Sequence, residues 1–477
     1  MRPRRPRPHG VVDRVGARDR PAGPGRGPPP RSPGDAVPAP VAVRDPRRGV
    51  RIGVLPGHQR ALLPPRGVGA GPALPGAEPG GRGRRGPIVS RRADHAAPAG
   101  PHPAVEPLPA LTALRFVAAA YVLAFHFADR RFGRDALPET VALGYSGVTF
   151  FFLLSGFILA YNYRRVDLSE RAARVRFLRA RVARVYPVYL LALAVALPWF
   201  VVWTAKAAPP LQPLMAASAV LAPLGLHAWV PGAACALDCP SWSVSVELFF
   251  YALFPLLLPL ALRRPGVTAL VTLAAWAASN AAAILVWNRY APGHSLIDPG
   301  PGRAAILAQA IKYNPLLRLP EFVAGLLLFV LWQRVRLPVP PLLAVAGAAA
   351  LVLVALVDRI PEPLLHNGLT ALVWAPVILV GAQVRSGPLV AGWFVFLGRI
   401  SFALYLLHVP ADALVSSLDR AVLAGRLAET PWLGLGAATL LSLAAAAAVH
   451  LLVEEPARRR ILRPRSRPAA AAAVPSA

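Results

Sequence analysis

The sequence contains almost no cysteine, lysine or methionine. Cys235 and Cys239 are the only two cysteines in 477 residues, and two thiolates cannot complete the four-ligand site of structural zinc, so we expect no metal centre. Acidic residues are also scarce, 23 against 52 basic ones, which gives a formal net charge of +29. Such a charge would suggest nucleic acid for a soluble protein. Here the arginines flank apolar runs, which indicates membrane topology, and we expect no nucleic-acid partner.

The usual signatures of soluble enzymes are missing as well. The apolar part of the chain shows no glycine-rich phosphate loop, HExxH or GxSxG motif, and we expect no soluble catalytic domain after residue 460. Hydrophobic residues make up 55% of the chain, and several runs reach the roughly 18–20 apolar residues that a bilayer core requires. The sequence therefore predicts an all-α, polytopic membrane helix bundle surrounded by the lipid of the cell membrane.

About ten apolar segments are long enough to be transmembrane helices. They are 109–128, 141–162, 184–204, 242–262, 267–288, 316–333, 339–357, 366–384, 393–415 and 432–453. The segment 211–230 is apolar too, but Pro213, Pro223 and Gly225 interrupt it. We expect this segment to be re-entrant or interfacial rather than to cross.

The distribution of arginine predicts which loops are cytoplasmic. The loop 164–184 carries eight arginines and should lie inside. The other clusters on that side are Arg263 with Arg264, Arg334 with Arg336, Arg385, and Arg458 to Arg460 with Arg463. These assignments agree only if 211–230 does not cross, and both termini are then cytoplasmic. The loop 231–241 falls outside, where Cys235 and Cys239 form either a disulfide or two free thiols.

Composition divides the chain into three parts. Residues 1–107 are rich in Arg, Pro and Gly and lack apolar periodicity, so they cannot bury enough surface to offset their ordering entropy. We expect a disordered tail there, or a start site assigned too far upstream. Residues 108–460 form the membrane domain, and 461–477 form a second disordered, basic and Ala-rich tail.

The apolar segment LTALRFVAAAYVLAFHF carries Arg115 and His126. Eleven residues at about 100° each make roughly 1100°, close to three full turns, so both side chains share one helix face about 16 Å apart. Charge at membrane depth is costly and usually functional. Histidine suits proton transfer near neutral pH. The alternative is an arginine that extends to the headgroups and a histidine at the far interface.

Two carboxylates also fall within or beside apolar helices. Glu247, in PSWSVSVELFFY, is expected to orient His126, to act as a base or to neutralise Arg115. Glu321 follows Arg318 at an expected helix start, where the helix dipole stabilises an acidic side chain, so we assign it a structural role.

Arg181 and Arg184, in FLRARVARVYPVY, lie three residues apart and share a helix face. One interpretation is a topology signal, because positive residues collect at the cytoplasmic surface. The other is a clamp for a phosphorylated ligand, because the planar guanidinium matches phosphate geometry. The residues alone leave both open.

Taken in order, these motifs resemble the acyltransferase 3 family of integral membrane O-acyltransferases. The resemblance covers about residues 108–460 and rests on the ordered set rather than on any single motif. The matching motifs are Arg115-x10-His126, GVTFFFLLSGFILAY at 147–161, Arg181-x-x-Arg184, WSVSVE at 242–247, FLGRISFALYLLH at 396–408 and VEEP at 453–456. The segment RLPEF at 318–322 is similar to members that modify the sugars of antibiotics or other secondary metabolites.

The resemblance implies an acyl group, usually acetyl, moved from acyl-CoA to a hydroxyl of a sugar, glycan, lipid or metabolite. It also implies that His126 is the essential base with Arg115 as its partner, and that Arg181 and Arg184 belong to an arginine pair required for activity. The chain departs from the common family pattern at Val244 and Leu248, which leaves Glu247 as the only carboxylate of its motif.

The sequence therefore predicts a membrane-bound O-acyltransferase whose donor, acyl-CoA, is a substrate. A polytopic transporter of a small polar solute is the alternative, because transporters also carry intramembrane charges. The two halves of the chain lack corresponding Gly/Pro-broken helices, which a transporter built from repeats would show.

Overall fold

The computed structural model describes residues 106–463 with the exception of residue 301, and within this range the regular structure is entirely helical. The prediction of an all-α helix bundle is confirmed for these residues. The expected tails at 1–105 and 464–477 lie outside the described residues, so the division of the chain into a domain and two tails stays a prediction.

Nine helical stretches in the described part of the chain are long and apolar enough to cross a membrane. They are Pro109–Phe132, Glu139–Tyr163, Arg171–Lys206, Cys239–Arg263, Pro265–Tyr290, Arg303–Arg334, Glu362–Gly381, Gly392–Val422 and Pro431–Leu462. Their main helices are α1 (Pro109–Phe132), α3 (Gly147–Tyr163), α4 (Arg171–Lys206), α6 (Trp242–Arg263), α7 (Pro265–Tyr290), α8 (Arg303–Lys312), α9 (Pro315–Arg334), α12 (Ala371–Gly381), α13 (Gly392–Val422), α15 (Pro431–Val449) and α16 (Glu455–Leu462).

Two shorter helices account for the remaining apolar segments. Helix α10 (Val339–Ala355) has 17 residues, and at 1.5 Å per residue it reaches about 26 Å, slightly less than the bilayer core. It corresponds to the expected span 339–357, so nine long helices and one shorter one stand where we expected about ten. Helix α5 (Gln212–Leu221) has 10 residues, about 15 Å, which agrees with the expectation that 211–230 does not cross.

Three contacts identify the two ends of the bundle. At one end, which we call the arginine end, Arg385 forms a salt bridge of 3.4 Å with Glu106, and Arg179 donates to the carbonyl of Ile461. At the other end, the rings of Phe132 and Trp432 lie 4.5 Å apart. We call it the disulfide end, because Arg130 near the end of α1 lines a cavity together with Cys235 and Cys239. Helix α1 therefore begins, and α16 ends, at the same end of the bundle.

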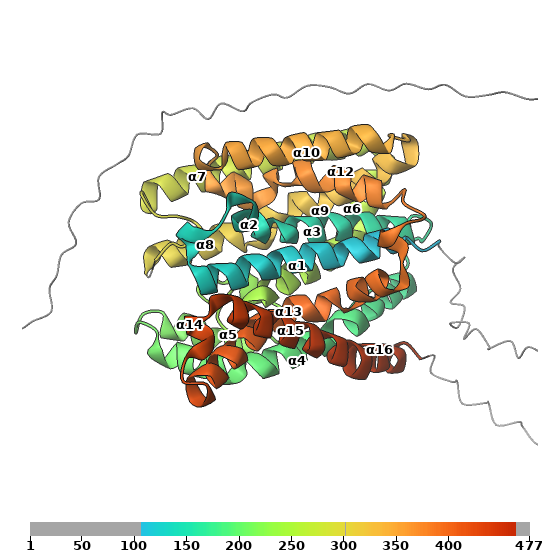
Figure 1. Cartoon of the computed structure of the whole chain (residues 1–477). Helices are drawn as coiled ribbons and strands as arrows, with labels where there is room; N and C mark the ends of the chain where they lie inside the picture. Colours follow the sequence, from blue (N-terminus) through green and yellow to red (C-terminus); the bar gives the residue numbers. More distant parts are fainter. Residues whose placement is uncertain (1–105, 301, 464–477) are drawn as a thin grey trace, which may run out of the picture. The chain divides into compact units, whose positions relative to one another are not determined.

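Glycines allow the central helices to approach closely. A Cβ atom at Gly156 of α3 would lie 2.2 Å from the carbonyl oxygen of Phe322 in α9, and one at Gly325 would lie 2.1 Å from that of Leu153. Small residues at a helix crossing have this role in membranes. Helix α1 lies between α3 and α13 (Figure 1) and packs closely on α13 through Gly398. These three helices, together with α4 and α6, surround the first cavity of the site described next.

Candidate active site

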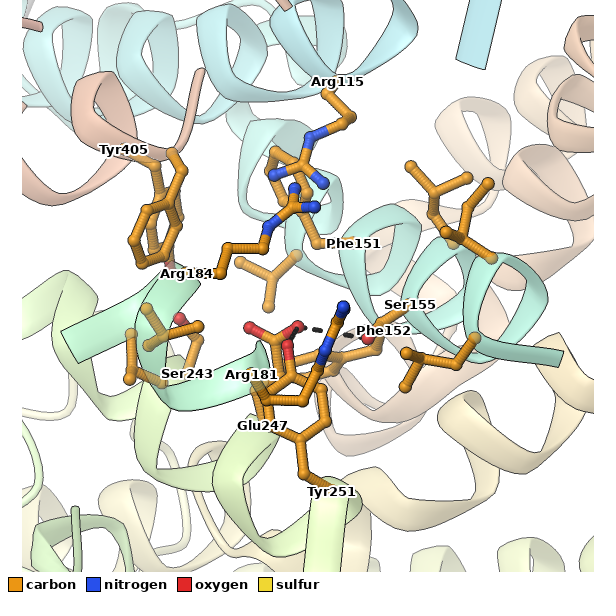
Figure 2. Close-up of a pocket in the computed structure, with 17 residues that line it drawn as sticks. Arg115, Phe151, Phe152, Ser155, Arg181, Arg184, Ser243, Glu247, Tyr251 and Tyr405 are labelled. Carbon is orange, nitrogen blue, oxygen red and sulfur yellow. Dashed lines mark hydrogen bonds between the residues drawn. The ribbon is translucent and has the colours of Figure 1, made fainter. Parts of the chain in front are cut away.

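A cavity of about 80 Å³ opens between α1, α3, α4, α6 and α13. We call it the arginine cavity, because three of its lining side chains are guanidinium groups (Figure 2). Its polar lining residues are Arg115, Ser155, Arg181, Arg184, Ser243, Glu247, Tyr251 and Tyr405. The fold thus brings four of the five predicted site residues, all except His126, to one cavity.

Glu247 is held in the arginine cavity by two hydroxyl groups. Ser155 of α3 donates to its carboxylate at 3.1 Å, and Tyr251, one turn further along α6, donates to the same oxygen atom (Figure 2). Arg115 donates from Nε to the hydroxyl of Ser401 on α13 at 3.4 Å. Glu247 shares the cavity with Arg115, whereas His126 lines a different cavity, so the geometry favours the expected role of neutralising Arg115 over that of orienting the histidine.

The arginine cavity holds more positive than negative charge. Arg115, Arg181 and Arg184 face one carboxylate, and in the described residues none of the three has a salt bridge within 4.0 Å. The buried Nε of Arg181 has no hydrogen-bond partner there. The guanidinium groups of Arg115 and Arg184 point toward one another (Figure 2). Like charges repel strongly away from water, so the cavity suits an anion with several acceptor oxygens, such as a phosphate.

A second cavity, of about 190 Å³, lies toward the disulfide end and contains His126, so we call it the histidine cavity. Its wall is aromatic, and the rings of Trp242 and Tyr313 lie 4.6 Å apart. Its remaining polar side chains are Asp129, Tyr145, Lys312, Arg318, His366 and Tyr405. A cavity of about 150 Å³ in another protein holds benzene, so this one has room for a ligand of similar ring size.

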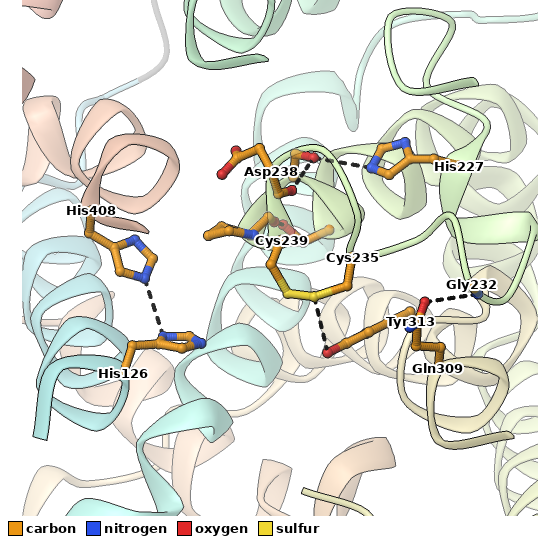
Figure 3. The surroundings of a disulfide bond; sticks show 12 residues. His126, His227, Gly232, Cys235, Asp238, Cys239, Gln309, Tyr313 and His408 are labelled. Atoms are coloured by element: carbon orange, nitrogen blue, oxygen red, sulfur yellow. Dashed lines mark hydrogen bonds between the residues drawn. A yellow bond between two sulfur atoms is a disulfide. The ribbon is translucent and has the colours of Figure 1, made fainter. Parts of the chain in front are cut away.

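Hydrogen bonds fix the tautomer of His126. His408 donates from Nδ1 to the carbonyl of Tyr405 at 2.7 Å, because a carbonyl can only accept. The Nε2 of His408 therefore carries a lone pair, and it lies 3.2 Å from Nδ1 of His126 (Figure 3). That Nδ1 also lies 2.9 Å from the carbonyl of Val122 and must be protonated. The Nε2 of His126 is thus left as the basic nitrogen.

Although they share a helix face, Arg115 and His126 line different cavities. Both contact α13, Arg115 at Ser401 and His126 at His408, as the predicted common face requires. Arg115 lines the arginine cavity and His126 the histidine cavity. The helix therefore places Arg115 in a cavity rich in arginine and His126 in a cavity rich in aromatic residues.

The disulfide loop closes one side of the histidine cavity. Cys235 and Cys239 are paired, which settles the alternative that the sequence left open. Gly232 donates to the side chain of Gln309 in α8 at 2.9 Å, and the hydroxyl of Tyr313 lies 3.9 Å from the sulfur of Cys235 (Figure 3). The loop is therefore attached to the segment that carries Lys312 and Tyr313.

Two titratable groups are buried beside this loop, outside the membrane-spanning segments. Burial raises the pKa of Asp238 well above its usual range, and neither carboxyl oxygen has a hydrogen-bond partner among the described residues. Burial lowers the pKa of His227 to about 4, while its hydrogen bond with Ser241 acts in the opposite direction. Burial thus favours the uncharged forms of both residues.

Glu321 has a structural role, but not for the reason the sequence suggested. It lies on the second turn of α9, not at its start. It is fully buried and forms a salt bridge of 3.0 Å with Arg318, and Thr149 donates to it at 2.8 Å. Pairing with a buried guanidinium, rather than the helix dipole, explains why this carboxylate can be buried.

Sequence reasoning did not assign the groups around His126. His408 had a detectable signal, since a histidine in the apolar run FALYLLHVP is costly at membrane depth. No such signal marks Lys312, Tyr313 or Asp129, because the end of α8 and the end of α1 look like ordinary polar helix ends in the sequence. Only the tertiary packing shows that these residues face His126.

Comparison with known proteins supports an acyltransferase. A family model described as an acyltransferase domain matches residues 108–451. The chain is 30% identical over 411 residues to Acyltransferase MdmB of Streptomyces mycarofaciens, which covers 78% of this chain and 97% of that protein. It is 41% identical over 91 residues to Protein 2 in picA locus of Rhizobium radiobacter, which covers 19% of this chain and 44% of that protein. No solved structure matches the chain.

Proposed function

The chain belongs to the acyltransferase 3 family, and from this premise we propose that it transfers a short acyl group, most simply acetyl, from acyl-CoA to a hydroxyl of a sugar, cell-envelope glycan or secondary metabolite. The observation that carries the proposal is the contact between a cationic cavity suited to the donor and a cavity that holds a basic histidine. Family membership also favours an enzyme over the transporter alternative.

The enzyme lies in the cell membrane with its arginine end in the cytoplasm. Arg179 and Arg385 lie at that end, together with the end of α16, and positively charged loops are retained on the cytoplasmic side. This orientation places the arginine cavity nearer the compartment that supplies acyl-CoA. The disulfide then faces the oxidising side of the membrane, where such bonds persist.

Arg181 and Arg184 bind phosphate groups of acyl-CoA. Both are partly exposed on α4, three residues apart, and the unpaired Nε of Arg181 is a donor available for a ligand oxygen. Arg115 lines the same cavity and is available to stabilise negative charge that develops on the thioester carbonyl. Glu247 limits the repulsion among the three arginines when the donor is absent.

His126 acts as the base from its Nε2 atom. It removes the proton of the acceptor hydroxyl as that oxygen bonds to the thioester carbon, the carbon–sulfur bond breaks, and the thiolate of CoA takes up the proton. His408 is a positioning residue, because its Nε2 and the carbonyl of Val122 both face the single Nδ1 proton of His126, at 3.2 and 2.9 Å from that nitrogen, and so keep the other nitrogen basic.

The proposal is tested by release of CoA thiol. Membranes that contain the full chain are given acetyl-CoA, with water as the acceptor, and thiol is measured over time. We expect thiol release that depends on His126. The same vesicles are assayed for uptake of labelled sugars, and uptake without thiol release would contradict the proposal and support a transporter.

A further inference from the structure

Two side chains separate the arginine cavity from the histidine cavity. Val148 of α3 and Tyr405 of α13 line both cavities, and no other described residue does so. Both residues are buried, each with 7% of its surface exposed. We call this pair the partition.

Contacts hold the ring of Tyr405 between the two sites. On one side its centroid lies 5.8 Å from that of Phe151, and the guanidinium of Arg115 lies 5.9 Å from the Phe151 ring. On the other side it lies 6.0 Å from the ring of His408, which contacts His126. The ring of Tyr405 thus lies between the two cavities and forms part of the wall of each.

Val148 is held in place through its neighbour in the chain. A Cβ atom at Gly147 would lie 2.7 Å from the carbonyl oxygen of Ala118, so the start of α3 packs directly on the backbone of α1. Helix α1 also carries Arg115 and His126. The backbone position of Val148 relative to both functional residues is therefore fixed, and the size of its side chain sets the width of the partition.

The reaction requires the thioester carbon of the donor to be reachable from both cavities. The phosphates of acyl-CoA are held at the arginines, whereas the hydroxyl to be acylated lies at His126, and Arg115 and His126 are about 16 Å apart along α1. The thioester carbon must therefore reach the partition. We propose that Val148 and Tyr405 form the acyl-group subsite and restrict the donor to a short, unbranched acyl chain, an inference that rests on the proposed function.

The chemistry of the partition fits this assignment. A methyl-sized group can pack against an isopropyl group and an aromatic ring without leaving a polar atom unpaired. A longer chain has to displace a side chain in a packed interior. A pocket of this kind discriminates by roughly 10–200-fold for each methylene group.

The test compares three variants of the full chain in membranes, with thiol release from acetyl-, propionyl-, butyryl- and hexanoyl-CoA as the readout. Val148→Ala should raise kcat/KM for butyryl-CoA relative to acetyl-CoA by about tenfold or more. Val148→Leu should lower kcat/KM for propionyl-CoA relative to kcat/KM for acetyl-CoA. Tyr405→Phe keeps the ring and should leave the order of preference unchanged.

Val244→Ala is the matched control, because Val244 is buried and lines only the arginine cavity. It should leave the ratio of butyryl to acetyl turnover as in the unmodified protein. The subsite is refuted if Val148→Ala and Val244→Ala change the ratio alike, or if neither does. If Val148→Ala does not accumulate in membranes, the test relies on Val148→Leu. An unchanged preference of Val148→Leu for propionyl-CoA relative to acetyl-CoA also refutes the subsite. An unmodified protein that releases no thiol from any acyl-CoA overturns the proposed function instead.

Discussion

The arginine cavity and the histidine cavity both border the same face of α1, yet different ionisable side chains line them. The first contains guanidinium groups, which stay protonated at any physiological pH. The second contains His126, Asp129 and Lys312 among aromatic rings, with Arg318 as its one guanidinium group. Of the only two lysines in the chain, one is here. The difference teaches that residues on one helix face can line two cavities of different chemical character.

The largest expected effect comes from breaking the histidine cavity. His126→Ala should lower the rate of acyl transfer by about 10²–10⁴-fold without reducing the amount of protein in the membrane, because it removes the general base. The control is His294→Ala, which changes an exposed histidine outside both cavities. Thiol release by equal amounts of each protein measures the effect. A variant at position 126 that keeps near-normal turnover would show that the base lies elsewhere.

Replacing the arginines on the other side of the partition should affect binding rather than chemistry. In Arg181→Lys with Arg184→Lys the charge remains but the planar fork is lost. Each lost charge-assisted bond is worth about 1.5–3 kcal/mol, so KM for acyl-CoA should rise about tenfold or more per bond.

The matched control for the double lysine variant is Arg176→Lys with Arg179→Lys. These arginines have the same spacing on the same helix but are exposed and line neither cavity. Acyl-CoA titrations on membranes of equal protein content measure KM. Equal values for the two double variants would mean that Arg181 and Arg184 act only as topology signals.

The two intramembrane glutamates should separate function from stability. Glu247→Gln should lower turnover, because it removes the negative charge from a cavity with three arginines. Glu321→Gln should lower the free energy of unfolding by about 3–5 kcal/mol, because it leaves Arg318 buried without its counter-ion. Turnover per folded molecule and melting in detergent distinguish them. Equal losses of turnover at equal folded amounts would contradict this division.

The smallest expected effect concerns the loop behind the histidine cavity. Because burial raises the pKa of Asp238, the folded protein retains a proton that the unfolded chain releases above pH about 3.9. The stability that this proton supports is present at low pH and is lost as pH rises toward the folded-state pKa. Asp238→Asn should therefore raise the melting temperature more at pH 8 than at pH 5. An equal change at both values would exclude ionisation as the cause.

The sequence predicted the helices well, because long apolar runs have few alternatives in a bilayer. The short α5 was foreseeable from Pro213, Pro223 and Gly225. The common face of Arg115 and His126 followed from helical periodicity. Periodicity gives the direction of a side chain but not its neighbour, so neither the partition nor the bond from Ser155 to Glu247, 92 residues apart, could be foreseen.

The charge pattern located Arg181 and Arg184 correctly at a helix surface but could not decide between two uses. Topology and phosphate binding require the same residue type at the same end of the helix. The structure adds that both side chains line a cavity, while Arg176 and Arg179 on the same helix do not. This difference between the two pairs depends on the three-dimensional position of the neighbouring helices, which the sequence does not give.

The contact between Gly156 and Gly325 has a consequence for how the sequence can vary. Since a methyl group at either position would overlap a carbonyl oxygen of the facing helix, even alanine would wedge α3 and α9 apart. Helix α3 carries Val148 and Ser155, and α9 carries Arg318 and Glu321. Substitutions at these two glycines would thus shift Val148 and Ser155 relative to Arg318 and Glu321, although neither glycine lines the arginine cavity or the histidine cavity.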